Sequence, residues 1–271
     1  MQIQEFDYHS AQKRSAEKIG LTLRWLYKWE ISSRQVLSEL LGIERSAMYQ
    51  TLTKFEKQGL ISSFSMSNCR SKIYHLSEHG VAVARELFVG KKDEYLKTKF
   101  YPSKINTNHC HHDFLAQHVV LDLMKMQENS RFLSDRQLRL REKLYLRNGY
   151  KIPDAVVHLG SHKKPYQILV EVQESPLPSV RLELMLSLYA EAIRTGDIQG
   201  LIFASTKKHI LAHANKIILR GVRHFNFVEN RWQPISTSVR DSPLSPDIVG
   251  GPIKLIDLNG LAAHYYNHII R

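Results

Sequence analysis

The stretch that decides the fold of the first part of the chain runs from Ser32 to Gly80 and reads SSRQVLSELLGIERSAMYQTLTKFEKQGLISSFSMSNCRSKIYHLSEHG. Ser32, with Gln35 three residues later, has the spacing of a capping box at the start of a short helix. Gly42 follows the last apolar residue and marks the end of that helix. The helix presents an apolar stripe to its neighbours, made of Val36, Leu37, Leu40 and Leu41.

A second helix is predicted over residues 44–58, after a tight turn at Gly42 and Ile43. Its buried stripe has helical spacing and consists of Met48, Leu52 and Phe55. At about 100° per residue, a polar face lies opposite that stripe. Its hydroxyl, amide and ammonium groups suit base edges and phosphates, and it comprises Ser46, Tyr49, Gln50, Thr53 and Lys57. We interpret this second helix as a recognition helix.

Further elements are predicted around the helix pair. They are a helix over 11–29, a strand over 60–66, a turn over 67–71, a returning strand over 72–76, and a helix over 78–87 capped by Ser77. The hairpin carries positive charge on Arg70 and Lys72. This order resembles the MarR-like and related winged-helix families, which implies a winged helix-turn-helix that binds DNA. A winged helix used for protein contacts is the alternative.

Composition agrees with a polyanionic partner. The chain of 271 residues has a formal net charge of +12 and a pI near 9.6. Basic and acidic residues number 17 and 11 up to residue 105, and 21 and 15 after it, so both parts are basic. Nucleic acid fits this excess better than a membrane, because no apolar run reaches the ~20 residues that span a bilayer.

Two further observations favour the cytoplasm. The first ten residues, MQIQEFDYHS, lack the basic and apolar layout of a signal peptide. The chain contains only two cysteines, Cys69 and Cys110, which form neither a disulfide framework nor a CxxC zinc motif. His109, His111 and His112 adjoin Cys110, but their spacing is not that of a closed zinc site.

A basic stretch with Lys91, Lys92, Lys97, Lys99 and Lys104 leads into a predicted second domain over residues 105–271. Residues 1–104 then form the winged helix-turn-helix domain with its linker. The second domain is predicted to have helices over 111–127, 179–194 and 209–219, and strands over 138–146, 150–159, 166–172, 200–204 and 224–228. A loop over 240–252 precedes a final apolar segment over 253–270. The fold class is α/β, in the α+β sense.

Two carboxylates in this domain have an informative spacing. Asp154 follows Pro153 on one strand of a predicted hairpin, and Glu171 lies 17 residues later on the next strand. Alternation along the strand places Gln173 on the same face as Glu171. Carboxylate oxygens at one sheet edge suit Mg²⁺ or Mn²⁺, and such a site serves phosphodiester cleavage. An acid within the apolar run of residues 168–172 would be costly to bury without a partner.

At these residues the domain resembles the PD-(D/E)xK nuclease superfamily, whose core is a helix, three strands, a helix and a further strand. That resemblance implies a restriction-endonuclease-like mixed sheet flanked by helices, with Asp154 and Glu171 as metal ligands and as catalytic residues together with Gln173. Gln173 departs from the pattern, because it stands where the superfamily usually has lysine. The alternative sources of positive charge are Lys151, or Lys163 and Lys164 in the predicted hairpin turn.

The wider layout is similar to the replication-relaxation family and the MOBC-type plasmid mobilisation relaxases. The residues that carry this likeness are His112-Asp113, Pro153-Asp154-Ala155, Glu171-Val172-Gln173 and the helix from Arg181 to Tyr189. The resemblance implies a metal-dependent nickase acting at a plasmid transfer origin. His112 and Asp113 would be accessory at most. A covalent tyrosine is a further alternative, with Tyr166 and Tyr189 nearest the site in sequence.

Three functional hypotheses follow. The first is a metal-dependent DNA-nicking relaxase, in which the winged helix selects the site and the second domain cuts. The second is a DNA-binding regulator of replication or transcription whose nuclease-like domain is inactive, a hypothesis that Gln173 favours. In the third, the second domain serves only dimerisation. Expected partners are double-stranded DNA at a plasmid origin, accessory mobilisation proteins and a second copy of the chain, with no membrane.

Overall fold

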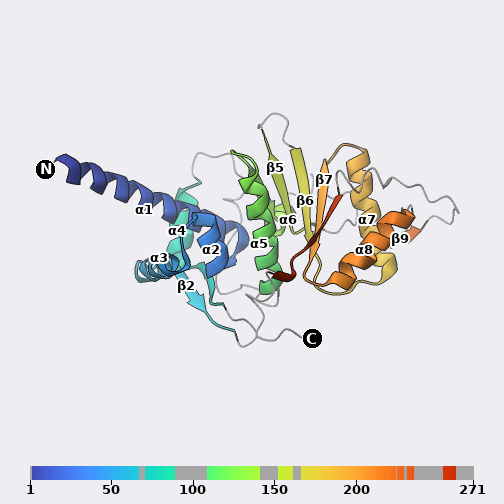
Figure 1. Ribbon diagram of the computed structural model, residues 1–271, viewed down its shortest axis with the longest axis horizontal. Coiled ribbons are helices and arrows are strands. Elements are labelled where there is room, and N and C mark those ends of the chain that lie inside the picture. The colour runs from blue at the N-terminus through green and yellow to red at the C-terminus, as the bar shows by residue number, and fades with distance from the viewer. Residues whose placement is uncertain are drawn as a thin grey trace. The chain divides into compact units, whose positions relative to one another are not determined.

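The computed structural model describes residues 2–66, 71–88, 109–140, 152–160, 166–223, 225–228, 231–234 and 253–260 (Figure 1). The chain divides into two compact units, with the division between Phe114 and Leu115. The domain boundary predicted at residues 104 and 105 lies outside the described residues.

The first unit is a winged helix-turn-helix. In chain order it contains α1 (Gln2–Trp29), β1 (Ile31–Ser33), α2 (Arg34–Leu41), α3 (Arg45–Lys57), β2 (Ile61–Phe64), β3 (Ile73–Leu76) and α4 (Glu78–Glu86). The three strands form an antiparallel sheet in the order β1-β3-β2. The predicted helix pair, hairpin and following helix are confirmed. The short strand β1 was not predicted, because three residues are too few to show a strand period.

The start of α2 differs from the prediction by one residue. Ser33, and not Ser32, is the N-cap, and its Oγ accepts a hydrogen bond of 3.2 Å from the backbone N–H of Val36. Ser32 lies in β1, paired with Tyr74 of β3. Gly42 ends the helix as predicted, with φ of 60°, a left-handed conformation that glycine adopts without strain.

The core of the first unit comes from every one of its helices. The stripe predicted for the second helix is buried, with Met48, Leu52 and Phe55 at most 2% exposed. It is joined by other fully or almost fully buried side chains, namely Leu23, Leu26, Ile31, Val36, Leu37, Ile73, Leu76 and Ala84. This packing fixes the orientation of α3, so the opposite face of the helix is left to solvent.

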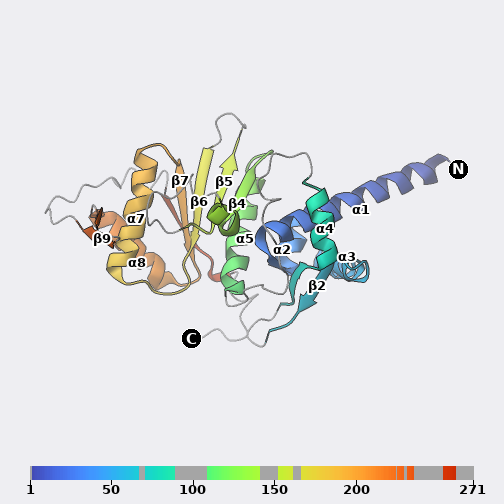
Figure 2. The same cartoon turned by 180° about the vertical axis from the view of Figure 1, so that it is seen from behind.

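The second unit is built on a five-stranded mixed sheet in the order β10-β7-β6-β5-β4 (Figure 2). Its strands are β4 (Arg131–Ser134), β5 (Ala155–Leu159), β6 (Tyr166–Val172), β7 (Gly200–Ser205) and β10 (Ile253–Asp257). Strands β4, β5 and β6 pair antiparallel, whereas β6, β7 and β10 pair parallel. The sheet is therefore mixed, as the sequence predicts.

Most of α5 (Cys110–Lys125) belongs to this unit, together with α6 (Asp135–Leu140), α7 (Ser179–Arg194) and α8 (Lys208–Arg220). A separate hairpin is formed by β8 (Phe225–Val228) and β9 (Arg231–Pro234). Figures 1 and 2 both show α7 and α8 beside β7. A right-handed crossover through α7 is the usual way to join two parallel neighbours such as β6 and β7.

The first strand of this sheet was placed wrongly from the sequence. Residues 138–140 belong to α6 and not to a strand, and the strand that precedes them is β4. The Gln137 side chain accepts a hydrogen bond of 2.9 Å from the backbone N–H of Ser134, and Asp135 accepts one of 2.6 Å from that of Arg136. These bonds start a helix, and they outweigh the strand-like alternation of the following residues.

The end of the chain contributes one strand to the sheet. The predicted apolar segment over 253–270 begins with β10, which pairs in parallel with β7. The loop predicted over 240–252 lies outside the described residues. Among the helices that the structure describes, none is long and apolar enough to cross a membrane.

Candidate nucleic-acid interface and acidic cluster

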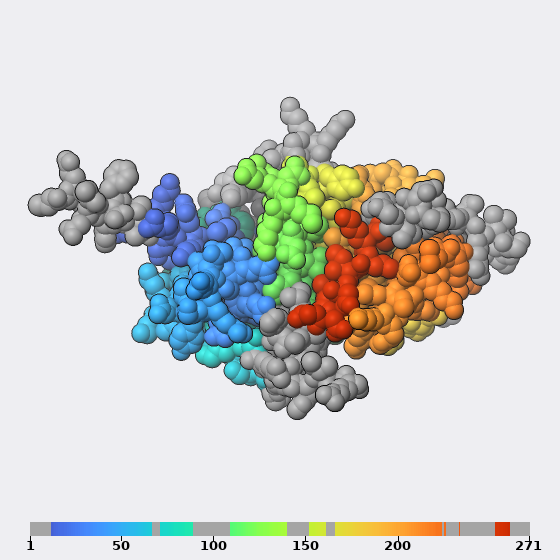
Figure 3. Space-filling view, in the orientation of Figure 1, coloured from blue at the N-terminus to red at the C-terminus, as the bar shows by residue number. Residues whose placement is uncertain are grey.

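The outer face of α3 is open to solvent. Ser46, Tyr49, Gln50 and Lys57 are exposed and Thr53 is half-buried. Tyr49 is notable because 56% of a large aromatic side chain faces water. In the space-filling view, the light-blue atoms of α2 and α3 lie at the surface (Figure 3). The polar face predicted for the recognition helix is therefore accessible, while its contact with DNA stays a prediction.

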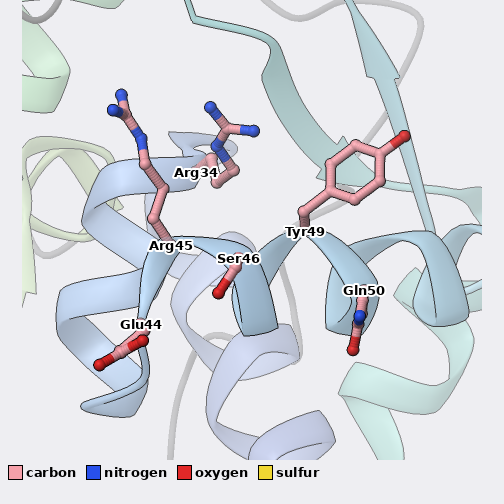
Figure 4. A pocket seen from close by; sticks show the side chains of 6 residues that line it. All are labelled: Arg34, Glu44, Arg45, Ser46, Tyr49 and Gln50. Carbon is pink, nitrogen blue, oxygen red and sulfur yellow. The ribbon is translucent and has the colours of Figure 1, made fainter.

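The first turn of α3 borders an open hollow of about 940 Å³. It is lined by Arg34, Glu44, Arg45, Ser46, Tyr49 and Gln50. The side chains of Arg34 and Arg45 extend to the same side as the Tyr49 ring, whereas the Glu44 carboxylate points to the other side (Figure 4). The two guanidinium groups are thus presented together, away from the acid.

Sequence reasoning missed Arg34 and Arg45 as members of this surface. Arg34 is the first residue of α2 and Arg45 the first residue of α3. Their side chains come together only because the turn at Gly42 and Ile43 brings the two helix starts close in space. That turn is held by a hydrogen bond of 2.5 Å from Ser38 Oγ to the carbonyl of Ile43.

The wing is tied to α3 by side chains. Ser63 Oγ of β2 donates a hydrogen bond of 2.5 Å to Glu56 Oε1 of α3. Tyr74 of β3 is 3% exposed, and burial raises the pKa of its hydroxyl; the nearby charge of Glu56 raises that pKa further, while Arg34 lowers it. The hairpin is therefore joined to α3 by a side-chain hydrogen bond, and Tyr74 lies within range of the charges of Glu56 and Arg34.

Of the two residues predicted to contact DNA from the wing, only Lys72 lies among the described residues. Lys72 is exposed at the start of the returning strand. Arg70 lies outside the described residues.

In the second unit, Asp154 lies at the end of the β5–β6 pairing. Its backbone N–H donates to the carbonyl of Val170 at 3.0 Å, and its Oδ2 accepts a hydrogen bond of 2.6 Å from the backbone N–H of Val172. Its own carbonyl accepts a hydrogen bond of 2.9 Å from the N–H of Asp135. The Asp154 side chain, 8% exposed, thus replaces a backbone acceptor where the strand pairing ends.

Glu171 is fully buried, with no exposed surface. Its Oε2 accepts a hydrogen bond of 3.0 Å from the hydroxyl of Tyr189 on α7. Burial raises the pKa of Tyr189 well above its usual 10.0, and negative charge on Glu171 and Asp154 raises it further. Both acids therefore lie close enough to act on one tyrosine, and we call Asp154, Glu171 and Tyr189 the acid–tyrosine cluster.

The cluster also bears on the covalent tyrosine considered from the sequence. A tyrosine must lose its proton to attack a phosphorus atom, and Tyr189 is 3% exposed with a raised pKa. Tyr166 is 49% exposed, and its hydroxyl donates to the carbonyl of Gln199 at 3.1 Å. Tyr189 is therefore poorly suited to be a nucleophile.

Gln173 follows β6 and is 7% exposed. Its side-chain N–H donates a hydrogen bond of 2.5 Å to the backbone carbonyl of Ser175. The backbone carbonyl of Gln173 accepts a hydrogen bond of 2.6 Å from Ser205 Oγ. These bonds fix the turn after β6 to the end of β7. Lys151, Lys163 and Lys164, suggested as substitutes for the missing lysine, lie outside the described residues.

The acid–tyrosine cluster contains two carboxylates, those of Asp154 and Glu171. Among the described residues, no three histidine, cysteine, aspartate or glutamate side chains gather to hold a metal ion. Asp154 and Glu171 each already use one oxygen for a hydrogen bond to the chain. His112 and Asp113 contact each other at 3.4 Å on α5, and Cys110 is buried.

No family model and no curated protein matches the chain. A mutant of ZitR from Lactococcus lactis in apo form is 30% identical over 31% of this chain and 66% of that chain, with a TM-score of 0.25. In two further mutant ZitR structures the match covers 48% and 47% of their length. The chain thus spans about half to two thirds of the ZitR chains it matches.

Two other solved structures have a lower sequence identity to this chain. A MarR family transcriptional regulator from Silicibacter pomeroyi is 22% identical over 31% of this chain and 60% of that chain, with a TM-score of 0.24. The adhesin competence repressor AdcR from Streptococcus pyogenes is 16% identical over 52% and 90%, with a TM-score of 0.25. At such TM-scores the likenesses carry no weight, and the winged helix rests on the order and pairing of the chain's own elements.

Proposed function

We propose that this chain is a DNA-binding regulator that places α3 in the major groove of a duplex. One observation carries the proposal: the exposed face of α3 holds Ser46, Tyr49 and Gln50, while the opposite face is buried in the core of the unit. The major groove is about 12 Å wide and admits one α-helix. An amide such as that of Gln50 can pair with the N6 and N7 of adenine, and hydroxyl groups can reach either kind of base pair.

The surroundings of α3 support the same proposal. Arg34 and Arg45 present two guanidinium groups beside the polar face, and Lys57 adds an ammonium group at the far end of the helix. Such cations bind phosphates and fix the register of the protein, while the polar face reads bases. The net charge of +12 strengthens binding to any polyanion.

In this proposal the second unit has a structural and not a catalytic role. Asp154 completes the pairing of β6, and Glu171 holds Tyr189 of α7. The side chain of Gln173, which supplies no charge, holds the turn after β6 by its hydrogen bond to the carbonyl of Ser175. The regulator hypothesis therefore explains each of the three residues by a hydrogen bond within the chain.

The experiment is a selection of duplexes by the full chain from a random double-stranded library. We expect wild type to enrich one sequence, and the double variant Tyr49→Ala, Gln50→Ala to lose that preference. The matched control, Tyr166→Ala with Gln12→Ala, removes the same exposed residue types elsewhere. The proposal would be contradicted if the double variant enriched the same sequence as wild type, or if wild type enriched no sequence.

A second candidate function is metal-dependent nicking of one DNA strand at a plasmid or mobile-element transfer origin. It is favoured by the element order α5, β4, α6, β5, β6, α7, β7, which is a helix, three strands with the short helix α6 after the first of them, a helix and a strand. It is also favoured by the acid–tyrosine cluster at the junction of β5 and β6. Asp154 and Glu171 would hold Mg²⁺ or Mn²⁺, with Gln173 near them, and accessory mobilisation proteins would be further partners.

Supercoiled plasmid decides between the two candidates. Wild type is incubated with Mg²⁺ or Mn²⁺ on a plasmid that carries the selected sequence, beside Asp154→Asn and Glu171→Gln. The regulator proposal expects no relaxed circles with any of the three. Relaxed circles made by wild type alone would establish the nickase, and equal nicking by all three would remove these acids from its active site.

A further inference from the structure

A second basic surface lies on the other side of α3, where that helix meets α1. A hollow of about 200 Å³ is lined there by Arg14, Ser15, Lys18, Thr51, Lys54 and Phe55. Arg14 and Lys18 are one helical turn apart on α1, and Lys54 Nζ lies 3.4 Å from Ser15 Oγ across the hollow. We call Arg14, Lys18 and Lys54 the α1–α3 triad.

The triad places three positive charges around one hollow. Arg14 and Lys54 are exposed and Lys18 is half-buried. Within the described part of the chain, no carboxylate lines the hollow and no ion pair involves these three side chains. Glu17 is exposed on the same helix but does not line the hollow. Two hydroxyl groups, of Ser15 and Thr51, complete a lining suited to an anion with several oxygens.

The position of the triad relative to the polar face of α3 indicates what the triad can contact. Lys54 and Arg45 are nine positions apart on α3, which at about 100° per residue places them on opposite sides of the helix. The face that carries Ser46, Gln50 and Lys57 lies between those two sides. Cations therefore border the polar face of α3 on both flanks, with Arg34 and Arg45 on one flank and the triad on the other.

We propose that the α1–α3 triad binds the phosphate backbone on one wall of the major groove, opposite the wall met by Arg34 and Arg45. The inference rests on the proposed entry of α3 into that groove. A helix in a major groove has a sugar–phosphate strand on each side, so paired cationic flanks match the two walls. The α1 helix thereby becomes part of the DNA-binding surface, and the triad supplies affinity without sequence preference.

The test is the salt dependence of binding to a labelled duplex of random sequence, about 25 base pairs long, or roughly two and a half helical turns. The slope of log K against log salt reports the number of phosphates neutralised. Each neutralised phosphate contributes about 0.9 to the magnitude of that slope. We therefore expect the slope of the full chain with Arg14→Gln, Lys18→Gln and Lys54→Gln to be smaller in magnitude by about 2.7.

The control removes the same number of positive charges elsewhere. Lys208, Lys216 and Lys254 are exposed, and none of them lines the hollow. We expect the Lys208→Gln, Lys216→Gln, Lys254→Gln variant to keep the wild-type slope to within about one phosphate. All six positions have accessible side chains, so thermal unfolding midpoints close to wild type are expected and are measured alongside.

The outcomes separate this inference from the function on which it rests. A wild-type slope in the triad variant, or an equal loss in the control variant, overturns the triad as a phosphate site. In either case duplex selection by wild type could still succeed, and the proposed function would stand. If wild type binds no duplex at any salt concentration, both the function and the triad site are overturned.

Discussion

The hydroxyl of Tyr189 donates a hydrogen bond of 3.0 Å to Glu171 Oε2 in the interior of the second unit. The bond joins α7 to β6, and both partners are almost or fully buried. Glu171 is thus an acid held inside a sheet by a neutral donor, and the charge of Asp154 acts on that same donor. A buried carboxylate that loses such a donor keeps its desolvation cost without compensation.

Replacing Tyr189 by phenylalanine is therefore expected to lower the free energy of unfolding at pH 7 by about 1–3 kcal/mol. Urea unfolding followed by circular dichroism measures the change. Tyr166→Phe is the control, because that hydroxyl belongs to a side chain that is 49% exposed, and we expect it to cost less than about 0.5 kcal/mol. Equal effects of the two changes would contradict the role of the buried bond.

Tyr189 also predicts a dependence of stability on alkaline pH. Its pKa is raised in the folded chain above its usual 10.0. Its contribution to the free energy of unfolding is then complete below pH 10 and is lost as the pH rises through the folded pKa, because the unfolded chain releases the proton first. The stability of wild type should fall more steeply above pH 10 than that of Tyr189→Phe. Parallel pH profiles would be evidence against this prediction.

Glu183 of α7 supplies a prediction in acid. It is 1% exposed and accepts hydrogen bonds from Arg220 Nη2 at 3.0 Å and from Arg223 Nη2 at 2.8 Å. Burial raises the pKa of Glu183, but the hydrogen bonds and charge of Arg223, aided by Arg220, lower it below its usual 4.5 overall. We expect Glu183→Gln to lower the free energy of unfolding by about 3 kcal/mol at pH 7.

The pH window of that effect follows from the lowered pKa. The stabilising contribution of Glu183 is present above pH 4.5 and is lost as the pH falls through the folded pKa, so wild type and Glu183→Gln should converge in acid. Glu191→Gln is the control, because its partner Arg194 is 62% exposed, and such surface pairs contribute at most about 1 kcal/mol. A difference that persists unchanged down to pH 2 would contradict the ion pair as its cause.

Gly80 is expected to tolerate no side chain. A Cβ atom at this position would lie 1.8 Å from the carbonyl oxygen of Leu60, which is backbone and unable to move aside cheaply. Gly80→Ala should lower the free energy of unfolding by about 3 kcal/mol or more. Gly20→Ala is the matched control in α1, where only the end of the Arg24 side chain must shift, and it should be neutral or stabilising by up to ~1 kcal/mol. Thermal melts compare the two; similar melting temperatures would refute the clash.

The fold of the first unit could be predicted from its sequence because its signals are local. The Met48, Leu52 and Phe55 stripe, the Gly42 turn and the Ser77 cap each act within a few residues, and the structure contains all of them. The first strand of the second unit was missed for a local reason as well. Ser134 and Gln137 have the spacing of a capping box, a signal that was present but that strand alternation obscured.

The candidate sites were harder to predict because they depend on contacts between distant segments. Arg34 and Arg45 line the same hollow only after α2 and α3 are packed. Arg14 and Lys54 line the other hollow from positions about forty residues apart, and hydrophobic periodicity gives no information on contacts at that separation. The placement of Asp154 beside the end of β6, which carries Glu171, was predictable from two neighbouring strands. The hydrogen bond of Glu171 to Tyr189 was not, since it requires the position of α7 over β6.

The most direct measurement for the central claim is the ratio of affinities for a selected duplex and a scrambled one, taken at one salt concentration for wild type and Gln50→Ala. We expect wild type to prefer the selected duplex clearly, and we expect this preference to fall by about 1–3 kcal/mol in Gln50→Ala. The affinity for the scrambled duplex should be unchanged. An unchanged preference, or an equal loss of affinity for both duplexes, would show that the exposed face of α3 does not read DNA.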